Sequence, residues 1–202
     1  MRTAVYHNPD LPAPEMTLLN AALNLMIRST PESVTATQVF KSAGVSKATF
    51  YQYFSGREDV WSGLLLEEER WRLDGLDKLS NLADEDAWYH FFRSLFQYPD
   101  KLAALQQMET RLRASPPDLR RYHHWQALRS TVLDRMVTVT HRVAGCPPAE
   151  SRQVVAGIWC YWEGWLRLYR DPEFSGLSGG RRQFAKWLAR DCARRMTGHA
   201  QS

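Results

Sequence analysis

The chain of 202 residues contains little cysteine, and its three thiols form no recognisable pattern. Cys146, Cys160 and Cys192 are an odd number at wide spacing, without a Cys-x-x-Cys pair, which argues against a disulfide framework. A reducing, cytoplasmic setting is therefore expected. No apolar run is long enough to span a bilayer, so no membrane partner is expected. The opening MRTAVYHNPDLPAPE lacks the basic-then-apolar order of a signal peptide and predicts a flexible leader over residues 1–14.

The sequence also lacks the short motifs of common enzymes. It has no nucleophile elbow, no phosphate-binding glycine loop and no His-Glu-x-x-His, so no catalytic residues, no cofactor and no enzymatic activity are expected. His123 and His124 are adjacent and would point about 100° apart on a helix, which disfavours a shared metal ion. The run Glu67–Glu69 has no helical histidine partner and is expected to be solvated surface. The net charge of +4 permits an anionic partner without indicating one.

Helical periodicity dominates the chain, and strand-like alternation is scarce. This predicts an all-α fold, and proline, glycine and capping residues divide it into about nine helices. The segment DPEFSGLSGG, residues 171–180, is expected to be a loop. The expected helices span residues 15–29, 36–43, 47–53, 56–80, 84–97, 100–114, 117–143, 148–170 and 180–197.

The second and third expected helices are short and closely joined. Thr35 can cap the second helix, Gly44 fits the left-handed position that ends it, and Ser46 can cap the third. Ser55 can cap the fourth, with Glu58 at the spacing of a capping box. Two short helices joined by a tight turn containing glycine predict a helix-turn-helix.

The third helix has two different faces. Phe50 and Phe54 share one side and are predicted core residues. The opposite side is polar with a small residue at its centre, so it can enter a DNA major groove without a clash. A capped turn without any DNA role would look partly similar, so both interpretations stay open on the pattern alone. The polar side carries Ala48, Thr49, Tyr51 and Gln52.

The stretch VTATQVFKSAGVSKATFYQYFSGREDVW, residues 34–61, resembles the DNA-binding signature of the tetracycline-repressor (TetR) family of bacterial transcription regulators. The shared features are the opening Thr35, the Ala43–Ser46 turn, the Tyr51-x-x-Phe54 pair and a following base and acid. The chain departs from the family pattern at Phe40, which is large for its site, and at Arg57, where the family usually has lysine.

The resemblance implies a helix-turn-helix DNA-binding domain over residues 15–56 and a ligand-binding and dimerisation domain over residues 57–202. Gln52 and Lys47 are the best candidates for reading bases, because an amide can pair with adenine and an amine with guanine. The DNA contacts that the resemblance implies are Thr35, Thr37, Ser46, Lys47, Ala48, Thr49, Tyr51, Gln52, Tyr53 and Arg57.

The remaining helices are dense in aromatic residues, which are either core or the lining of a pocket for a flat or lipophilic molecule. The candidate ligand-binding residues are Trp88, Phe92, Phe96, Arg111, His124, Trp125, Trp159, Trp162 and Glu163. The segment 148–170 is apolar on nearly every side, which predicts that it pairs with a second copy. The resemblance likewise implies a homodimer through residues 148–170 and 180–197.

These features together predict a ligand-responsive transcriptional regulator, expected to be a repressor. A two-fold dimer would place two recognition helices in successive major grooves of double-stranded DNA, so the operator should be near-palindromic. A small hydrophobic or aromatic effector would release it. The alternative is a helical small-molecule-binding protein or enzyme that does not bind DNA.

Overall fold

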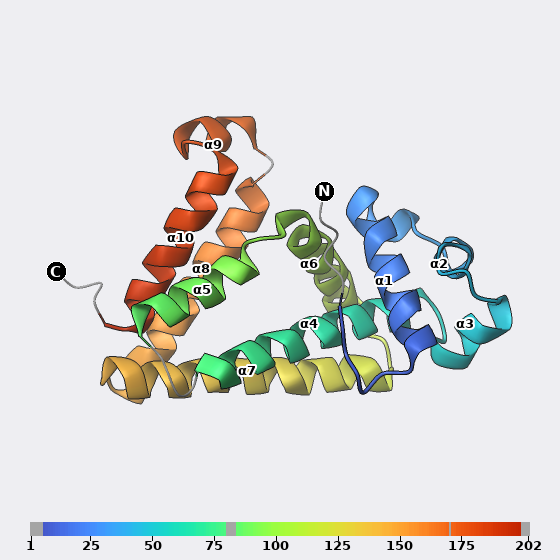
Figure 1. The fold of residues 1–202 in the computed structure, drawn as a ribbon, viewed down its shortest axis with the longest axis horizontal. Coiled ribbons are helices and arrows are strands. Elements are labelled where there is room, and N and C mark those ends of the chain that lie inside the picture. Colours follow the sequence, from blue (N-terminus) through green and yellow to red (C-terminus); the bar gives the residue numbers. More distant parts are fainter. Residues whose placement is uncertain (1–5, 80–83, 170, 199–202) are drawn as a thin grey trace. The chain divides into compact units, whose positions relative to one another are not determined.

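The computed structural model describes residues 6–79, 84–169 and 171–198 (Figure 1). Over these ranges the chain forms ten α-helices and one 3-10 helix, and no strand is present among the described residues. The all-α class is therefore confirmed. The elements are α1 (Ala13–Arg28), η1 (Pro31–Ser33), α2 (Ala36–Ser42), α3 (Lys47–Tyr53), α4 (Arg57–Leu79), α5 (Glu85–Leu95), α6 (Pro99–Ala114), α7 (Arg120–Ala144), α8 (Pro148–Leu168), α9 (Pro172–Leu177) and α10 (Arg181–Met196).

The additional helix is α9, and it lies in the segment that was expected to be a loop. Asp171 caps it, since its side chain accepts the backbone N–H of Phe174 at 2.9 Å, and Pro172 occupies the first helical position, where proline is favoured. The ring of Phe174 packs edge-on against Phe184 of α10 at 5.1 Å. The prediction of a loop was wrong, because the Asp171 cap and the Phe174 ring contact stabilise the six-residue helix α9.

The chain folds into two compact units. Of the described residues, unit 1 comprises 6–70 with 100–128, and unit 2 comprises 71–79, 84–99, 129–169 and 171–198. Both α4 and α7 continue from one unit into the other along the chain. The predicted boundary between a head and a body at residues 56 and 57 stays a prediction.

Unit 1 is built on a core shared by α1, α3, α4, α6 and α7. The first three helices, coloured blue to cyan, lie together in Figure 1, and α1 contacts both α2 and α3. Phe50 and Phe54 of α3 are completely or almost completely buried, which confirms their predicted core role. The core continues through Leu64 of α4 to Met108 of α6 and Trp125 of α7.

The segment before α1 is tied to unit 1. Tyr6 is buried; its backbone N–H donates to Asn20 Oδ1 at 2.9 Å, and its hydroxyl donates to Glu68 Oε2 at 2.8 Å. The amide of Asn8 donates to Glu67 Oε2 at 2.8 Å. The expectation of a loose leader therefore does not hold for Tyr6 and Asn8.

The acidic run Glu67–Glu69 is buried, with exposed fractions of 4%, 2% and 1%, so the prediction of solvated surface was wrong. Every residue of α4 from Val60 to Glu69 is buried, so this stretch has no outer side on which charges could be solvated. Buried charges must be paired. Accordingly, Lys101 of α6 contacts Glu68 at 2.5 Å, and Arg70 pairs with Glu67.

Unit 2 joins α5, α8 and α10, with α10 in contact with both other helices (Figure 1). Gly75 of α4 marks a close approach in this unit: a Cβ atom there would lie 3.0 Å from the ring of Phe91 on α5. Aromatic side chains fill the interior between these helices, and Trp88 of α5 is one that is fully buried.

Candidate nucleic-acid interface

The helix α2 begins with a complete capping box. Thr35 Oγ1 accepts the backbone N–H of Gln38, and the Gln38 side chain in return accepts the backbone N–H of Thr35 at 2.8 Å. Two donors that the helix start would otherwise leave without partners are thereby satisfied. Thr35 and Thr37 are both exposed. The sequence prediction of a Thr35 cap is confirmed.

The turn after α2 sets the start of α3. Gly44 has φ of 68°, the left-handed conformation expected of a residue that ends a helix. Its N–H donates to the Lys41 carbonyl at 3.2 Å, and the N–H of Val45 donates to the Phe40 carbonyl at 3.0 Å. Ser46 then caps α3, because its Oγ accepts the backbone N–H of Thr49 at 3.0 Å.

The helix α3 presents the polar face that its sequence predicts. Lys47, Ala48, Tyr51 and Gln52 are exposed, and Thr49 and Tyr53 are half-buried. Tyr51 is 51% exposed although it is large and aromatic, and the Lys47 ammonium lies 5.9 Å from the centre of its ring. The opposite face is closed by Phe50, whose ring packs on Phe40 at 6.3 Å and on Phe54 at 5.9 Å.

Arg57 is the first residue of α4, and its side chain contacts three neighbouring residues of the same chain. Its guanidinium donates to the backbone carbonyl of Glu32 at 3.1 Å and pairs with Glu58 at 3.2 Å. It also lies over the ring of Trp61, at 4.9 Å. The Glu32 carboxylate accepts from Arg111 of α6 at 2.8 Å. The hydrogen bond from Arg111 lowers the pKa of Glu32 below its ordinary value. No local sequence signal singles out Glu32, because its partner Arg111 lies 79 residues away.

The candidate ligand-binding residues fall into two groups. In unit 2, Trp88 stacks on Phe92 at 5.7 Å, Phe92 on Phe96 at 6.4 Å, and Phe96 meets Trp162 of α8 at 5.5 Å. These rings form a continuous column. Trp159, one turn from Trp162, lies under the guanidinium of Arg129 at 4.1 Å. Glu163 is half-buried on the same helix.

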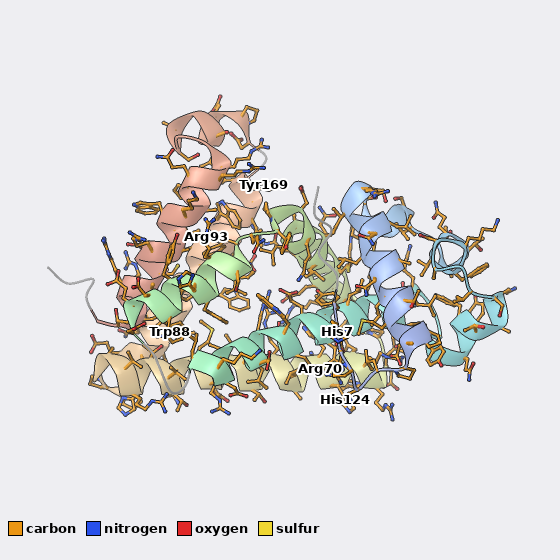
Figure 2. All side chains as sticks on the ribbon, in the orientation of Figure 1. His7, Arg70, Trp88, Arg93, His124 and Tyr169 are labelled. Atoms are coloured by element: carbon orange, nitrogen blue, oxygen red, sulfur yellow. The ribbon has the colours of Figure 1, made fainter. Side chains whose placement is uncertain are left out.

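The other three candidates belong to unit 1. Trp125 is fully buried in the core, where its ring contacts Tyr122 at 5.5 Å and Arg113 lies over it at 5.0 Å. Arg111 pairs with Glu32, and His124 is exposed on α7 (Figure 2). Their grouping with the aromatic column of unit 2 stays a prediction.

Among the described residues, no pattern of a metal site, a membrane-spanning helix or a disulfide is present. Within residues 6–79, 84–169 and 171–198, no three His, Cys, Asp or Glu side chains are grouped as metal ligands would be. None of the helices in these ranges combines the length and the apolar character that crossing a bilayer requires. All three cysteines are free thiols.

Two capped helices, a glycine turn between them and a solvated polar face on the second define a helix-turn-helix of the kind that DNA-binding regulators use. Residues 18–62 match the family model of bacterial regulatory proteins of the tetR family. Among curated proteins, none matches this chain by sequence. Residues 18–62 therefore form a DNA-binding domain of the TetR family of transcriptional regulators, as the sequence signature predicted.

Solved structures share the whole fold at low sequence identity. The fatty acid degradation regulator FadR from Bacillus halodurans aligns with a TM-score of 0.66 and 15% identity, covering 91% of this chain and 96% of its own. A chain from Mesorhizobium loti assigned to the TetR family of transcriptional regulators aligns with a TM-score of 0.61 and 15% identity, covering 91% and 94%. A chain from Syntrophomonas wolfei with the same assignment aligns with a TM-score of 0.58 and 13% identity. The alignment covers 90% of this chain and 93% of the other. This likeness shows that the helical body as well as the head has the fold of these proteins.

Proposed function

We propose that this protein is a homodimeric, cytoplasmic repressor that binds a near-palindromic operator and is released by a small hydrophobic or aromatic effector. The observation that carries the proposal is the outer face of α3. Lys47, Ala48, Tyr51 and Gln52 are all exposed there, while Phe50 and Phe54 anchor the other face in the core. A polar helix face that is rigidly supported and left in water is suited to a major groove.

The roles of individual residues follow from their positions. The hydroxyls at the start of α2 and the tyrosines of α3 are placed to donate to phosphate oxygens. Lys47 and Gln52 carry base recognition, since neither side chain is committed to the core. Arg57 reaches a phosphate by exchanging its bond to the neutral Glu32 carbonyl for a hydrogen bond to a negatively charged oxygen. The proposed DNA contacts are Thr35, Thr37, Ser46, Lys47, Ala48, Thr49, Tyr51, Gln52, Tyr53 and Arg57.

The dimer is proposed to form through α8 and α10. These helices carry large apolar side chains that the single chain leaves in solvent: Tyr161 is 40% exposed, Leu168 is 45% exposed and Trp187 is 58% exposed. Trp187 stacks on Phe184 at 5.4 Å, so the exposed ring is held in place rather than free to fold back. Exposed apolar residues concentrated on two adjacent helices are typical of an interaction surface. Trp187→Glu should therefore convert the dimer to a monomer in analytical ultracentrifugation, whereas Lys186→Glu, next to it, should not.

The effector is proposed to bind within unit 2 at the aromatic column. Trp88 and Trp165 are 0% and 3% exposed, and neither indole N–H has a hydrogen-bond acceptor among the described residues. A buried donor without an acceptor is unfavourable by about 1–3 kcal/mol. An effector with an apolar or aromatic body and an oxygen acceptor would satisfy such a donor. Its binding would favour a conformer whose two heads are wrongly spaced for the operator, and only its differential affinity for the two conformers can drive that change.

The proposal is tested by selecting bound duplexes from a random library with the full-length protein, and then titrating the selected site by fluorescence anisotropy. A near-palindromic site is expected, with half-sites one helical turn or a multiple apart. Its affinity should fall steeply with salt, because phosphate contacts release counterions. If no site is enriched, and the protein instead binds or turns over a small molecule, the alternative of a helical small-molecule-binding protein or enzyme replaces it.

A further inference from the structure

Arg121, the second residue of α7, connects the ends of three segments of unit 1. Its Nη2 donates to Glu15 Oε1 in the first turn of α1 at 2.7 Å. Its Nη1 donates to both carboxylate oxygens of Asp59 in the first turn of α4, at 3.0 and 3.1 Å. The guanidinium also lies 4.6 Å from the centre of the Phe54 ring, at the residue that ends α3.

The two carboxylates are in a protected setting. Glu15 and Asp59 are each 7% exposed. Burial alone would lower the pKa of Arg121, but the hydrogen bond to Glu15 and the charge of Asp59 raise it above its ordinary value. The cation therefore stays charged and compensates two acids at once. If Arg121 were removed, Glu15 and Asp59 would lose the positive charge that compensates them. Burying carboxylates without such compensation is strongly unfavourable.

Asp59 also holds the loop that follows α3. Its Oδ2 accepts the backbone N–H of Ser55 at 2.9 Å and the Ser55 hydroxyl at 3.1 Å. Ser55 was expected to form a capping box with Glu58, and it bonds to Asp59 instead. The loop of Ser55 and Gly56 lies between α3 and Arg57, so the carboxylate fixes the spacing of two proposed DNA-contacting elements.

The ring of Phe54 is completely buried and packs close to the backbone of α4. A Cβ atom at Gly63 of α4 would lie 3.4 Å from the Phe54 ring and 3.7 Å from Arg121 Cδ. The ring is thus held between the α4 backbone and the guanidinium. Both Arg121 and Glu15 lie outside residues 18–62, the segment matched by the family model.

We infer that Arg121 is a positioning residue for DNA binding: through Asp59, Ser55 and Phe54 it fixes the end of α3 and the start of α4 in the arrangement that the operator requires. It does not itself contact DNA in this inference, which rests on the proposed function for its DNA-binding readout. The helix-turn-helix is consequently supported by a residue of α7, which lies 62 residues after Asp59 in the sequence.

The test is a double-mutant cycle in the full-length protein with Arg121→Met, Asp59→Asn and the double variant. Arg120→Met is the matched control, because Arg120 is the exposed neighbour and loses the same charge. We expect Arg121→Met to raise the operator Kd about tenfold or more, and the double variant to bind within about threefold of Asp59→Asn, because residues in one network are not additive. Additive effects, or an unchanged Kd for Arg121→Met in folded protein, would overturn the inference.

A second measurement decides the matter without DNA. Hydrogen exchange in peptides covering residues 50–57 should be about tenfold faster in Arg121→Met than in Arg120→Met, because local opening of the loop becomes easier. Arg121→Lys keeps the charge but cannot bridge both acids as a guanidinium fork does, so hydrogen exchange in this variant should be intermediate. The same variant replaces Arg121→Met in the test if Arg121→Met does not fold. Unchanged exchange in both Arg121 variants refutes the inference. If wild-type protein selects no operator while the exchange result holds, the proposed function fails and the positioning of α3 stands.

Discussion

Replacing Ser46 with alanine tests whether the recognition helix depends on its cap. Ser46 Oγ accepts the Thr49 backbone N–H at 3.0 Å and shares a 2.8 Å hydrogen bond with the Thr49 hydroxyl. The helix α3 has only seven residues, so few internal hydrogen bonds can compensate for a lost cap. A helix this short has no stability of its own and relies on its ends and its packing.

The expected cost follows from the cap itself. Serine to alanine at an N-cap destabilises by about 1 kcal/mol, which for a chain of this size lowers the melting temperature by roughly 2–4 °C. If the opening is confined to α3, operator binding should weaken by at most about fivefold, the limit reached when α3 is mostly open in the free protein, because the apparent affinity falls with the fraction of protein in the competent conformer. Thr49 is half-buried, so its released N–H regains only part of its hydration.

Thermal unfolding followed by circular dichroism and anisotropy titration on the selected operator measure the two effects. Ser46→Asn is the matched control, since asparagine caps a helix about as well as serine and adds no charge. It should restore both melting temperature and affinity. An alanine variant that melts and binds like wild type would refute the reasoning; an asparagine variant that melts normally but binds weakly would show that the serine hydroxyl itself contacts DNA.

Three further predictions concern other parts of the chain. Burial raises the pKa of Cys192 to about 12, so a thiol reagent at pH 8 should modify Cys192 only after the protein unfolds. The pKa of Glu32 is lowered in the folded state, so its pairing stabilises above the ordinary value of about 4.3 and is lost as pH falls through the folded pKa. The deficit in melting temperature of Arg111→Ala should accordingly shrink below about pH 4, whereas a constant deficit would exclude the ion pair as its cause. Gly75→Ala should lower the melting temperature, because the new methyl group meets a phenylalanine ring at 3.0 Å; an unchanged melt would mean that the ring yields freely.

Local sequence signals were sufficient wherever the structure depends on neighbours a few residues apart. The Thr35 and Ser46 caps, the left-handed Gly44 and the buried Phe50 all follow from spacing and side-chain chemistry within one turn. The helix-turn-helix was therefore predictable, and so was the polar face of α3. The α9 turn was missed because its glycines and serines are typical of loops, and its single cap gave a weak signal.

Long-range pairing could not be predicted from one sequence. Arg121 meets Glu15 across 106 residues, and Arg111 meets Glu32 across 79. The acidic run at Glu67–Glu69 looks like surface on a helical wheel, because a wheel does not show that other parts of unit 1 cover α4 on every side between Val60 and Glu69. For the same reason, aromatic spacing did not separate Trp125, a core residue of unit 1, from the aromatic column of unit 2.

The central claim is that the outer face of α3 enters the major groove of operator DNA. An iron chelate attached to Ala48→Cys, in a background with Cys146 and Cys160 replaced by serine, measures this directly by cutting the DNA beside it. The account predicts two symmetric clusters of cuts, one in each half-site, and none from the same chelate on the exposed Gln107→Cys of α6. An uncut operator, or cuts independent of the attachment site while the protein remains bound, would contradict it.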